Sequence, residues 1–193
     1  MNDYKKAVEY YASNRIDYLF HNEGPDHAKT IFEVIFRNAK SYIRIAARNL
    51  WNNQVVNTAE YLNALSYYLN QENSKLDILI KDLPDIKELT ESNENNIFRF
   101  LYCHPAYSEG RITIHSGDGK CFKTSSDSEV HFCTADGHIY RYEYDIDNRK
   151  AEGNFNDIKK TQKLDALFID AFKDSREISL ETIFGKNGTS FAI

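Results

Sequence analysis

The sequence predicts an α/β fold in which a mixed β-sheet is flanked by helices. Apolar residues recur at helical spacing over residues 25–39 and again over 55–69, and apolar runs at 42–47 and 76–80 follow these helices as expected strands. Such alternation of strands and helices is typical of a parallel sheet covered by helices. The pair Asp136-Gly137 lies between two further apolar runs, which indicates an antiparallel hairpin. The sheet is therefore expected to contain both strand directions.

The domain organisation follows from the absence of an internal repeat or a low-complexity linker. We expect an N-terminal helix within residues 1–14, one compact domain over 15–184, and a loose C-terminal tail over 185–193. Ile16, Tyr18 and Phe20 alternate along the chain, so a short strand is expected there. It should end at the turn-forming residues 21–25.

The second half of the domain is expected to be richer in strands. A short helix is expected at 94–102, and strands are expected at 111–115, 129–135 and 138–144. A final long helix is expected to include residues 164–172. Before that last helix, the sequence Asn154-Phe155-Asn156-Asp157 provides side chains that cap a helix start.

Composition excludes several classes of protein. The chain has 193 residues, of which 41% are hydrophobic and 27% charged, so it is not expected to be disordered. No run approaches the roughly 18 apolar residues of a membrane span, and the polar start lacks the apolar stretch of a signal peptide. The three cysteines have no framework spacing, which argues against a disulfide scaffold or a zinc ribbon. We therefore expect a cytoplasmic domain without membrane contact, cofactor or metal.

The densest group of polar residues lies in and around the predicted hairpin. Alternation along 138–144 places Arg141 and Glu143 on one face of a strand, where they can pair with each other on a solvated face or orient a ligand together. The Arg fork suits a phosphate or a carboxylate. His131 and Cys133 share one side of the preceding strand, as a buried pair or as the start of a metal site.

Two parts of this chain resemble the phospholipase D-like superfamily. The run from Ala28 to Ala46 is similar to the opening helix and first core strand of those domains, in which the helix ends in an Ala-Lys pair. The hairpin falls where the family carries its His-x-Lys-x4-Asp motif. Aligned on Asp136, the chain has Glu129 at the His position and His131 at the Lys position. The family's Gly-Ser pair would fall at Glu143-Tyr144 and is absent.

The resemblance implies a single half-domain of a fold whose enzymes need two motifs. In that family the motif histidine is the nucleophile that forms a phosphohistidine, and a Glu at 129 is no simple replacement. The resemblance therefore favours a non-catalytic domain that binds a partner protein or a phosphate-bearing ligand, as a homodimer or as the small subunit of a bacterial assembly. The alternative is a metal-independent phosphodiesterase or nuclease that is active across a dimer, with His131 central.

The candidate ligand-binding residues are His131, Asp136, Arg141, Glu143 and Asn154. A third hypothesis is nucleic-acid binding without chemistry, because the early helix and strand carry a basic bias although the net charge of the whole chain is −5. The alternative is that these are ordinary solvated charges. The residues concerned are Lys29, Arg37, Lys40, Arg44 and Arg48.

Overall fold

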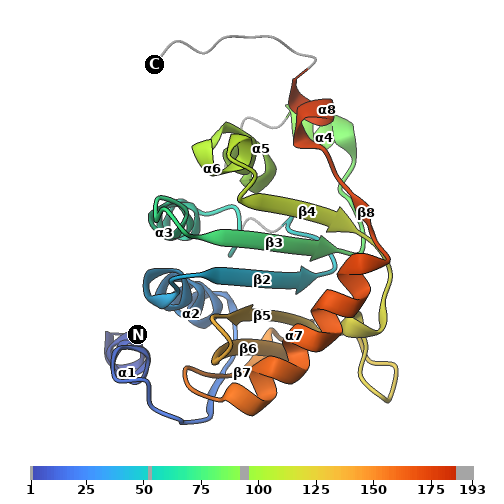
Figure 1. Cartoon of the computed structure of the whole chain (residues 1–193). Helices are drawn as coiled ribbons and strands as arrows, with labels where there is room; N and C mark the ends of the chain where they lie inside the picture. Colours follow the sequence, from blue (N-terminus) through green and yellow to red (C-terminus); the bar gives the residue numbers. More distant parts are fainter. Residues whose placement is uncertain (1, 52–53, 92–95, 186–193) are drawn as a thin grey trace.

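The computed structural model describes residues 2–51, 54–91 and 96–185. Its centre is an eight-stranded sheet with the strand order β1-β7-β6-β5-β2-β3-β4-β8 (Figure 1). The strands are β1 Phe20–Asn22, β2 Tyr42–Ala47, β3 Lys75–Ile80, β4 Ile112–Ser116, β5 His131–Ala135, β6 Ile139–Asp145, β7 Lys150–Asn154 and β8 Arg176–Glu177. β2, β3 and β4 run parallel, whereas β5, β6 and β7 form an antiparallel extension. The predicted mixed sheet is confirmed.

Helices cover both faces of this sheet. They are α1 Asn2–Ser13, α2 Pro25–Asn38, α3 Ala59–Leu69, α4 Ile86–Glu91, α5 Ile97–Cys103, α6 Pro105–Ser108, α7 Ile158–Lys173 and α8 Leu180–Phe184, with a 3-10 turn at Lys120–Phe122. Figure 1 shows α7 crossing one face over β5 and β6, with α2 and α3 on the other. Successive side chains along each strand point to opposite faces of the sheet. Ile45 joins the large cluster under α2 and α3, and Ala46 joins a smaller one under α7.

The hairpin between β5 and β6 forms where the Asp-Gly pair predicts it. Asp136 and Gly137 both have positive φ, at 51° and 74°. A primed type I turn requires that backbone at both central residues. The strands that it joins pair in an antiparallel register that sets His131 opposite Glu143.

The first strand lies later in the chain than predicted, and two strands, β7 and the two-residue β8, are not predicted from the sequence. β1 begins at Phe20 and includes His21 and Asn22, two of the residues expected to form the terminating turn. It pairs with β7, whose sequence Lys150–Asn154 is too polar to be recognised as a strand. Gly153 permits this pairing, because a Cβ atom there would lie 2.6 Å from the ring of Phe20.

Two predicted helices begin later than the apolar periodicity suggests. α3 begins at Ala59 because Thr58 is its N-cap, accepting a hydrogen bond from the backbone N–H of Tyr61. α5 begins at Ile97 because the Asn96 side chain accepts bonds from two free backbone N–H groups. The predicted residues 94 and 95 lie outside the described residues. The short helices α4, α6 and α8 were not predicted, since four to six residues carry too little periodicity.

The N-terminal helix expected within 1–14 is present as α1, which packs on α2 and is tied to it by an ion pair between Lys5 and Glu33. The expected loose tail lies outside the described residues from 186 onward. Within the described ranges, none of the helices has the length and apolar character that a membrane crossing requires.

Candidate functional site

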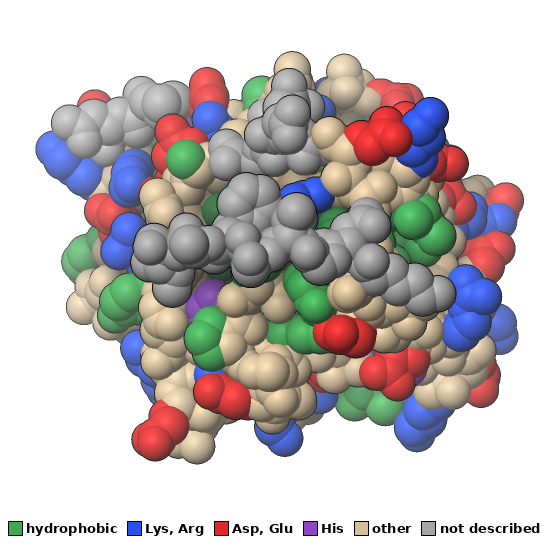
Figure 2. Space-filling view, turned by 90° about the horizontal axis from the view of Figure 1, so that it is seen from above, with side chains coloured by type: hydrophobic (Ala, Val, Ile, Leu, Met, Phe, Trp, Pro, Cys, Tyr) green, Lys and Arg blue, Asp and Glu red, His purple; other side chains and the backbone are tan. Residues whose placement is uncertain are grey.

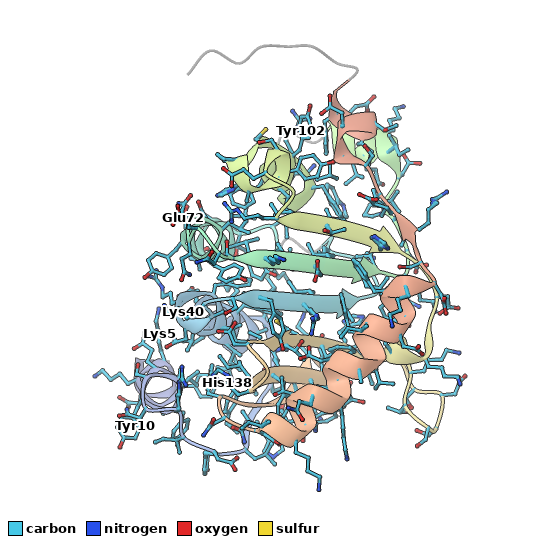
Figure 3. The ribbon with its side chains drawn as sticks, viewed as in Figure 1. Lys5, Tyr10, Lys40, Glu72, Tyr102 and His138 are labelled. Atoms are coloured by element: carbon cyan, nitrogen blue, oxygen red, sulfur yellow. The ribbon has the colours of Figure 1, made fainter. Side chains whose placement is uncertain are left out.

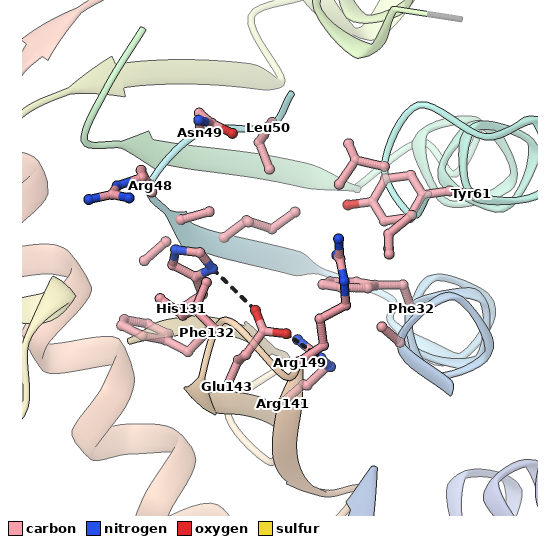
Figure 4. A pocket seen from close by; sticks show the side chains of 17 residues that line it. Phe32, Arg48, Asn49, Leu50, Tyr61, His131, Phe132, Arg141, Glu143 and Arg149 are labelled. Carbon is pink, nitrogen blue, oxygen red and sulfur yellow. Dashed lines mark hydrogen bonds and ion pairs between the residues drawn. The ribbon is translucent and has the colours of Figure 1, made fainter. Parts of the chain in front are cut away.

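A cavity of about 200 Å³ opens where β2 ends, on the face of the sheet that α2 and α3 cover. The last residues of β2 and the segment 48–50 form one side of it, and His131 at the start of β5 forms another. Phe32 from α2 and Tyr61 from α3 close it from the helical layer (Figure 4). Ligands of open α/β sheets commonly bind at the carboxyl ends of parallel strands. The cavity therefore lies at a position where ligands of such sheets commonly bind.

Three of the predicted site residues meet in this cavity. Nδ1 of His131 lies 3.1 Å from Oε2 of Glu143, and Nη2 of Arg141 donates a hydrogen bond of 2.9 Å to the other carboxylate oxygen (Figure 4). The antiparallel pairing of β5 and β6 sets His131 opposite Glu143, and period-two alternation puts Arg141 on the same face. The sheet thus holds the three side chains in one row.

The Arg141–Glu143 pair is buried, which corrects the expectation of a solvated face. Arg141 is only 3% exposed, and its Nε donates a hydrogen bond to the side chain of Asn22 on β1. Burial alone would raise the pKa of Glu143. The hydrogen bond from His131 and the charge and hydrogen bond of Arg141 outweigh it and lower the pKa to about 2. Glu143 is therefore a fixed anion at the centre of the row.

A second carboxylate faces the other nitrogen of His131. Oε1 of Glu129 lies 3.4 Å from Nε2 of His131, an ion-pair distance. Neither atom makes a hydrogen bond elsewhere in the described part of the chain. The other oxygen of Glu129 lies 3.0 Å from Nη2 of Arg48, which also contacts Asp82. The histidine ring is thus enclosed between two glutamates, and each glutamate is also paired with an arginine.

Two predicted site residues do not line the cavity. Asp136 lies at the opposite end of β5, where its carboxylate accepts hydrogen bonds from the backbone N–H groups of residues 40, 41 and 42. Figure 3 shows Lys40 and His138 at this end of the sheet, where β2 begins. Asn154 on β7 donates to Asp17 and accepts from the backbone of Asn156. Both residues tie segments of the fold together.

The sequence does not identify several residues that line the cavity. Arg48 belongs to the basic bias of the early helix and strand, and Phe32 and Tyr61 lie on helix faces whose apolar residues predict core packing. Arg149 lies in the turn between β6 and β7 and has a φ of 53°. Nothing in the local sequence indicates that the turn directs this arginine into the cavity. Only the fold brings these four residues together.

The five residues of the basic bias do not form one surface. Lys29 and Arg48 contact nearby carboxylates, and Arg44 pairs with Asp165 of α7 on the face away from the cavity. Arg37 lies over the ring of Tyr67, and Lys40 is exposed beside the hairpin. On the face seen in Figure 2, Lys and Arg side chains alternate with Asp and Glu.

The predicted start of a metal site is not extended by further ligands. Cys133 belongs to the hydrophobic core below the cavity, and His131 contacts the two glutamates instead. Over residues 2–51, 54–91 and 96–185, no group of three or more His, Cys, Asp or Glu side chains is arranged to hold a metal ion.

The fold has counterparts among solved structures. The chain is similar to Nuc from Salmonella typhimurium, a phospholipase D family member, with a TM-score of 0.56 and 12% identity over 84% of this chain and 99% of Nuc. The chain is also similar to NucT from Helicobacter pylori, with a TM-score of 0.54 and 9% identity. This similarity covers 83% of this chain and 100% of NucT. A third similar structure is that of TrmBL2, an archaeal chromatin protein with a novel mode of DNA binding. Its TM-score is 0.56 and its identity 10%, over 92% of this chain.

These similarities identify the fold. The chain has the phospholipase D-like fold that the resemblance of its sequence implies. It spans the whole of NucT but only 62% of TrmBL2. No protein-family model and no curated protein matches the sequence. At identities of 9–12% the likeness concerns the fold alone, so function is argued from the cavity.

Proposed function

We propose that this phospholipase D-like chain is a non-catalytic domain that binds a phosphate-bearing ligand in the cavity between β2, β5 and α2. The observation that carries the proposal is the placement of His131 between Glu129 and Glu143. A nucleophile needs a free lone pair directed at the reacting atom, at about 3–3.5 Å. Here the carboxylate of Glu129 lies in front of Nε2, and Glu143 occupies Nδ1.

Charge also opposes catalysis by His131. A phosphodiester that approached Nε2 would meet the negative charge of Glu129 at the same distance, and like charges repel at such range. The alternative of a phosphodiesterase or nuclease centred on His131 is therefore less well supported than binding. Nucleic-acid binding through the basic bias has weaker support still, because those five side chains are dispersed over different parts of the fold.

The charges around the cavity support an anionic ligand. Arg48, Arg141 and Arg149 line it, and Glu143 is the one carboxylate among the described lining residues. The three arginines come from separate segments, in a chain whose net charge is −5. An arginine fork matches the oxygen atoms of a phosphate group. The partly exposed arginines, Arg48 and Arg149, are the ones from which we expect donors for the ligand.

Isothermal titration with inorganic phosphate, at constant ionic strength, tests the proposal. The chain has a single tryptophan, Trp51, next to the lining residue Leu50, so its fluorescence provides a second readout. We expect saturable binding that Arg149→Gly weakens at least tenfold. Glycine is favoured at the positive φ of this position, so the variant should fold well. Arg15→Gly is the matched control, since Arg15 also has a positive φ of 50° but is exposed and not a lining residue.

Two results would contradict the proposal. One is the absence of saturable phosphate binding to the wild type. The other is equal weakening by Arg149→Gly and Arg15→Gly, which would indicate a general effect of charge.

The proposal also includes association into a homodimer, which rests on the resemblance to enzymes that need two motifs. Light scattering after size exclusion should give twice the mass of the chain at micromolar concentration, and a strict monomer would remove this part. The alternative is that the chain associates with a different partner protein and not with a second copy of itself.

A further inference from the structure

The floor of the cavity contains a polar atom that the fold leaves unused. The side chain of Tyr61 is fully buried, and its hydroxyl makes no hydrogen bond within the described residues. Figure 4 shows this hydroxyl directed into the cavity from α3. A buried hydroxyl without a partner costs free energy, so native proteins rarely retain one. A ligand that bonds to this hydroxyl would remove the cost.

The space around this hydroxyl suits a ring. The wall is largely apolar and includes the edge-on aromatic pair of Phe32 and Tyr61, whose ring centroids lie 5.2 Å apart. The cavity volume of about 200 Å³ exceeds the roughly 150 Å³ of engineered apolar cavities that accept benzene. Further apolar lining residues include Ala28, Ile45, Leu50, Val55 and Val56.

Arg149 is held on the cavity by a strained backbone. A non-glycine residue at a φ of 53° is uncommon, and such positions concentrate at functional sites. One nitrogen of its guanidinium donates to Gln54, and a guanidinium carries five N–H donors in all. It is therefore placed to receive the charged end of a ligand whose other end lies beside Tyr61.

We infer that the cavity binds a phosphate monoester of a single ring. The phosphate contacts Arg149, the ring packs against Phe32, and a polar atom on the ring accepts the hydroxyl hydrogen of Tyr61. This inference rests on the proposed function and adds the chemical class of the ligand. An acyclic phosphate, such as a lipid headgroup, would leave both the apolar wall and the hydroxyl without a contact.

Calorimetric titration with four phosphates tests the inference. The probes are inorganic phosphate, glycerol 3-phosphate, phenyl phosphate and 4-nitrophenyl phosphate, whose nitro group accepts a hydrogen bond. We expect both ring compounds to bind about tenfold or more tighter than inorganic phosphate and glycerol 3-phosphate. The nitro compound should bind tighter than phenyl phosphate.

The variant Tyr61→Phe separates the hydroxyl from the ring. It should lower affinity for 4-nitrophenyl phosphate about five- to tenfold, to that of phenyl phosphate, and leave the other probes unchanged. Loss of an unpartnered hydroxyl should keep or raise the melting temperature. Tyr4→Phe is the matched control, because the hydroxyl of Tyr4 is also buried without a partner but Tyr4 does not line the cavity.

The outcomes distinguish this inference from the proposed function. If all four compounds bind equally, or if Tyr61→Phe and Tyr4→Phe have the same effect on affinity, the ring inference is wrong while phosphate binding stands. If none of the four binds, the proposed function fails with it.

Discussion

Nδ1 of His131 lies 3.1 Å from Oε2 of Glu143, directly across the β5–β6 ladder. Both residues sit on the cavity face of the sheet, and the second oxygen of Glu143 accepts from the buried Arg141. The three side chains form a network of paired charges at the start of β5 and on the adjacent strand β6.

Glu143→Gln should destabilise the fold by about 3 kcal/mol, because it leaves the guanidinium of Arg141 buried without its anion. Urea unfolding followed by circular dichroism measures the change in the free energy of unfolding. Glu9→Gln, at an exposed position of α1, is the control and should stay within about 0.5 kcal/mol of wild type. Equal stability of the two variants would show that the buried pair contributes nothing.

The stability of the wild type should depend on pH through Glu143. Its folded pKa is lowered from the ordinary value of 4.5 to about 2, so the contribution to stability is fully present above pH 4.5 and is lost as the pH falls towards 2. The loss is up to about 3 kcal/mol, from the size of the shift. Glu143→Gln should lack this part of the profile. Parallel curves for wild type and variant between pH 5 and pH 2 would contradict the assignment.

Asp136→Asn should weaken the fold without changing the cavity. Asn tolerates the positive φ at this position but removes the charge that binds the backbone N–H groups of residues 40–42. We expect a loss of about 1–3 kcal/mol in the free energy of unfolding. Phosphate affinity should stay at the wild-type value. A loss of affinity without a loss of stability would place Asp136 in the binding site after all.

The three thiols should differ in reactivity. Burial raises the pKa of Cys121 and of Cys133 to about 12, and both side chains are shielded, whereas Cys103 is exposed. Iodoacetamide should therefore modify one cysteine in the native protein and three in urea. Peptide mass spectrometry identifies the sites. Native modification of Cys133 would mean that the core below His131 opens readily.

The sequence predicts the parts of the fold that periodicity and turn chemistry determine. The helix from Pro25, the strands β2 and β3 and the Asp136-Gly137 hairpin all follow from local patterns. β7 escapes prediction because its strand character comes from pairing with β6 and with Phe20 of β1, not from its own polar residues.

The same contrast applies to the candidate site. Alternation within one hairpin brings His131, Arg141 and Glu143 together, so they could be predicted. The burial of Arg141 depends on Asn22, more than a hundred residues away in the sequence. Tyr61 and Arg149 reach the cavity from a helix and a turn whose sequences carry no functional signal. Their approach depends on tertiary packing, which local patterns do not encode.

Hydrolysis of bis(4-nitrophenyl) phosphate in the presence of EDTA tests most directly the claim that His131 is enclosed and does not act as a nucleophile. The rate of nitrophenolate release should be the same for buffer, wild type and His131→Asn purified in parallel. Turnover by the wild type that is abolished in His131→Asn would contradict the account and establish the phosphodiesterase alternative.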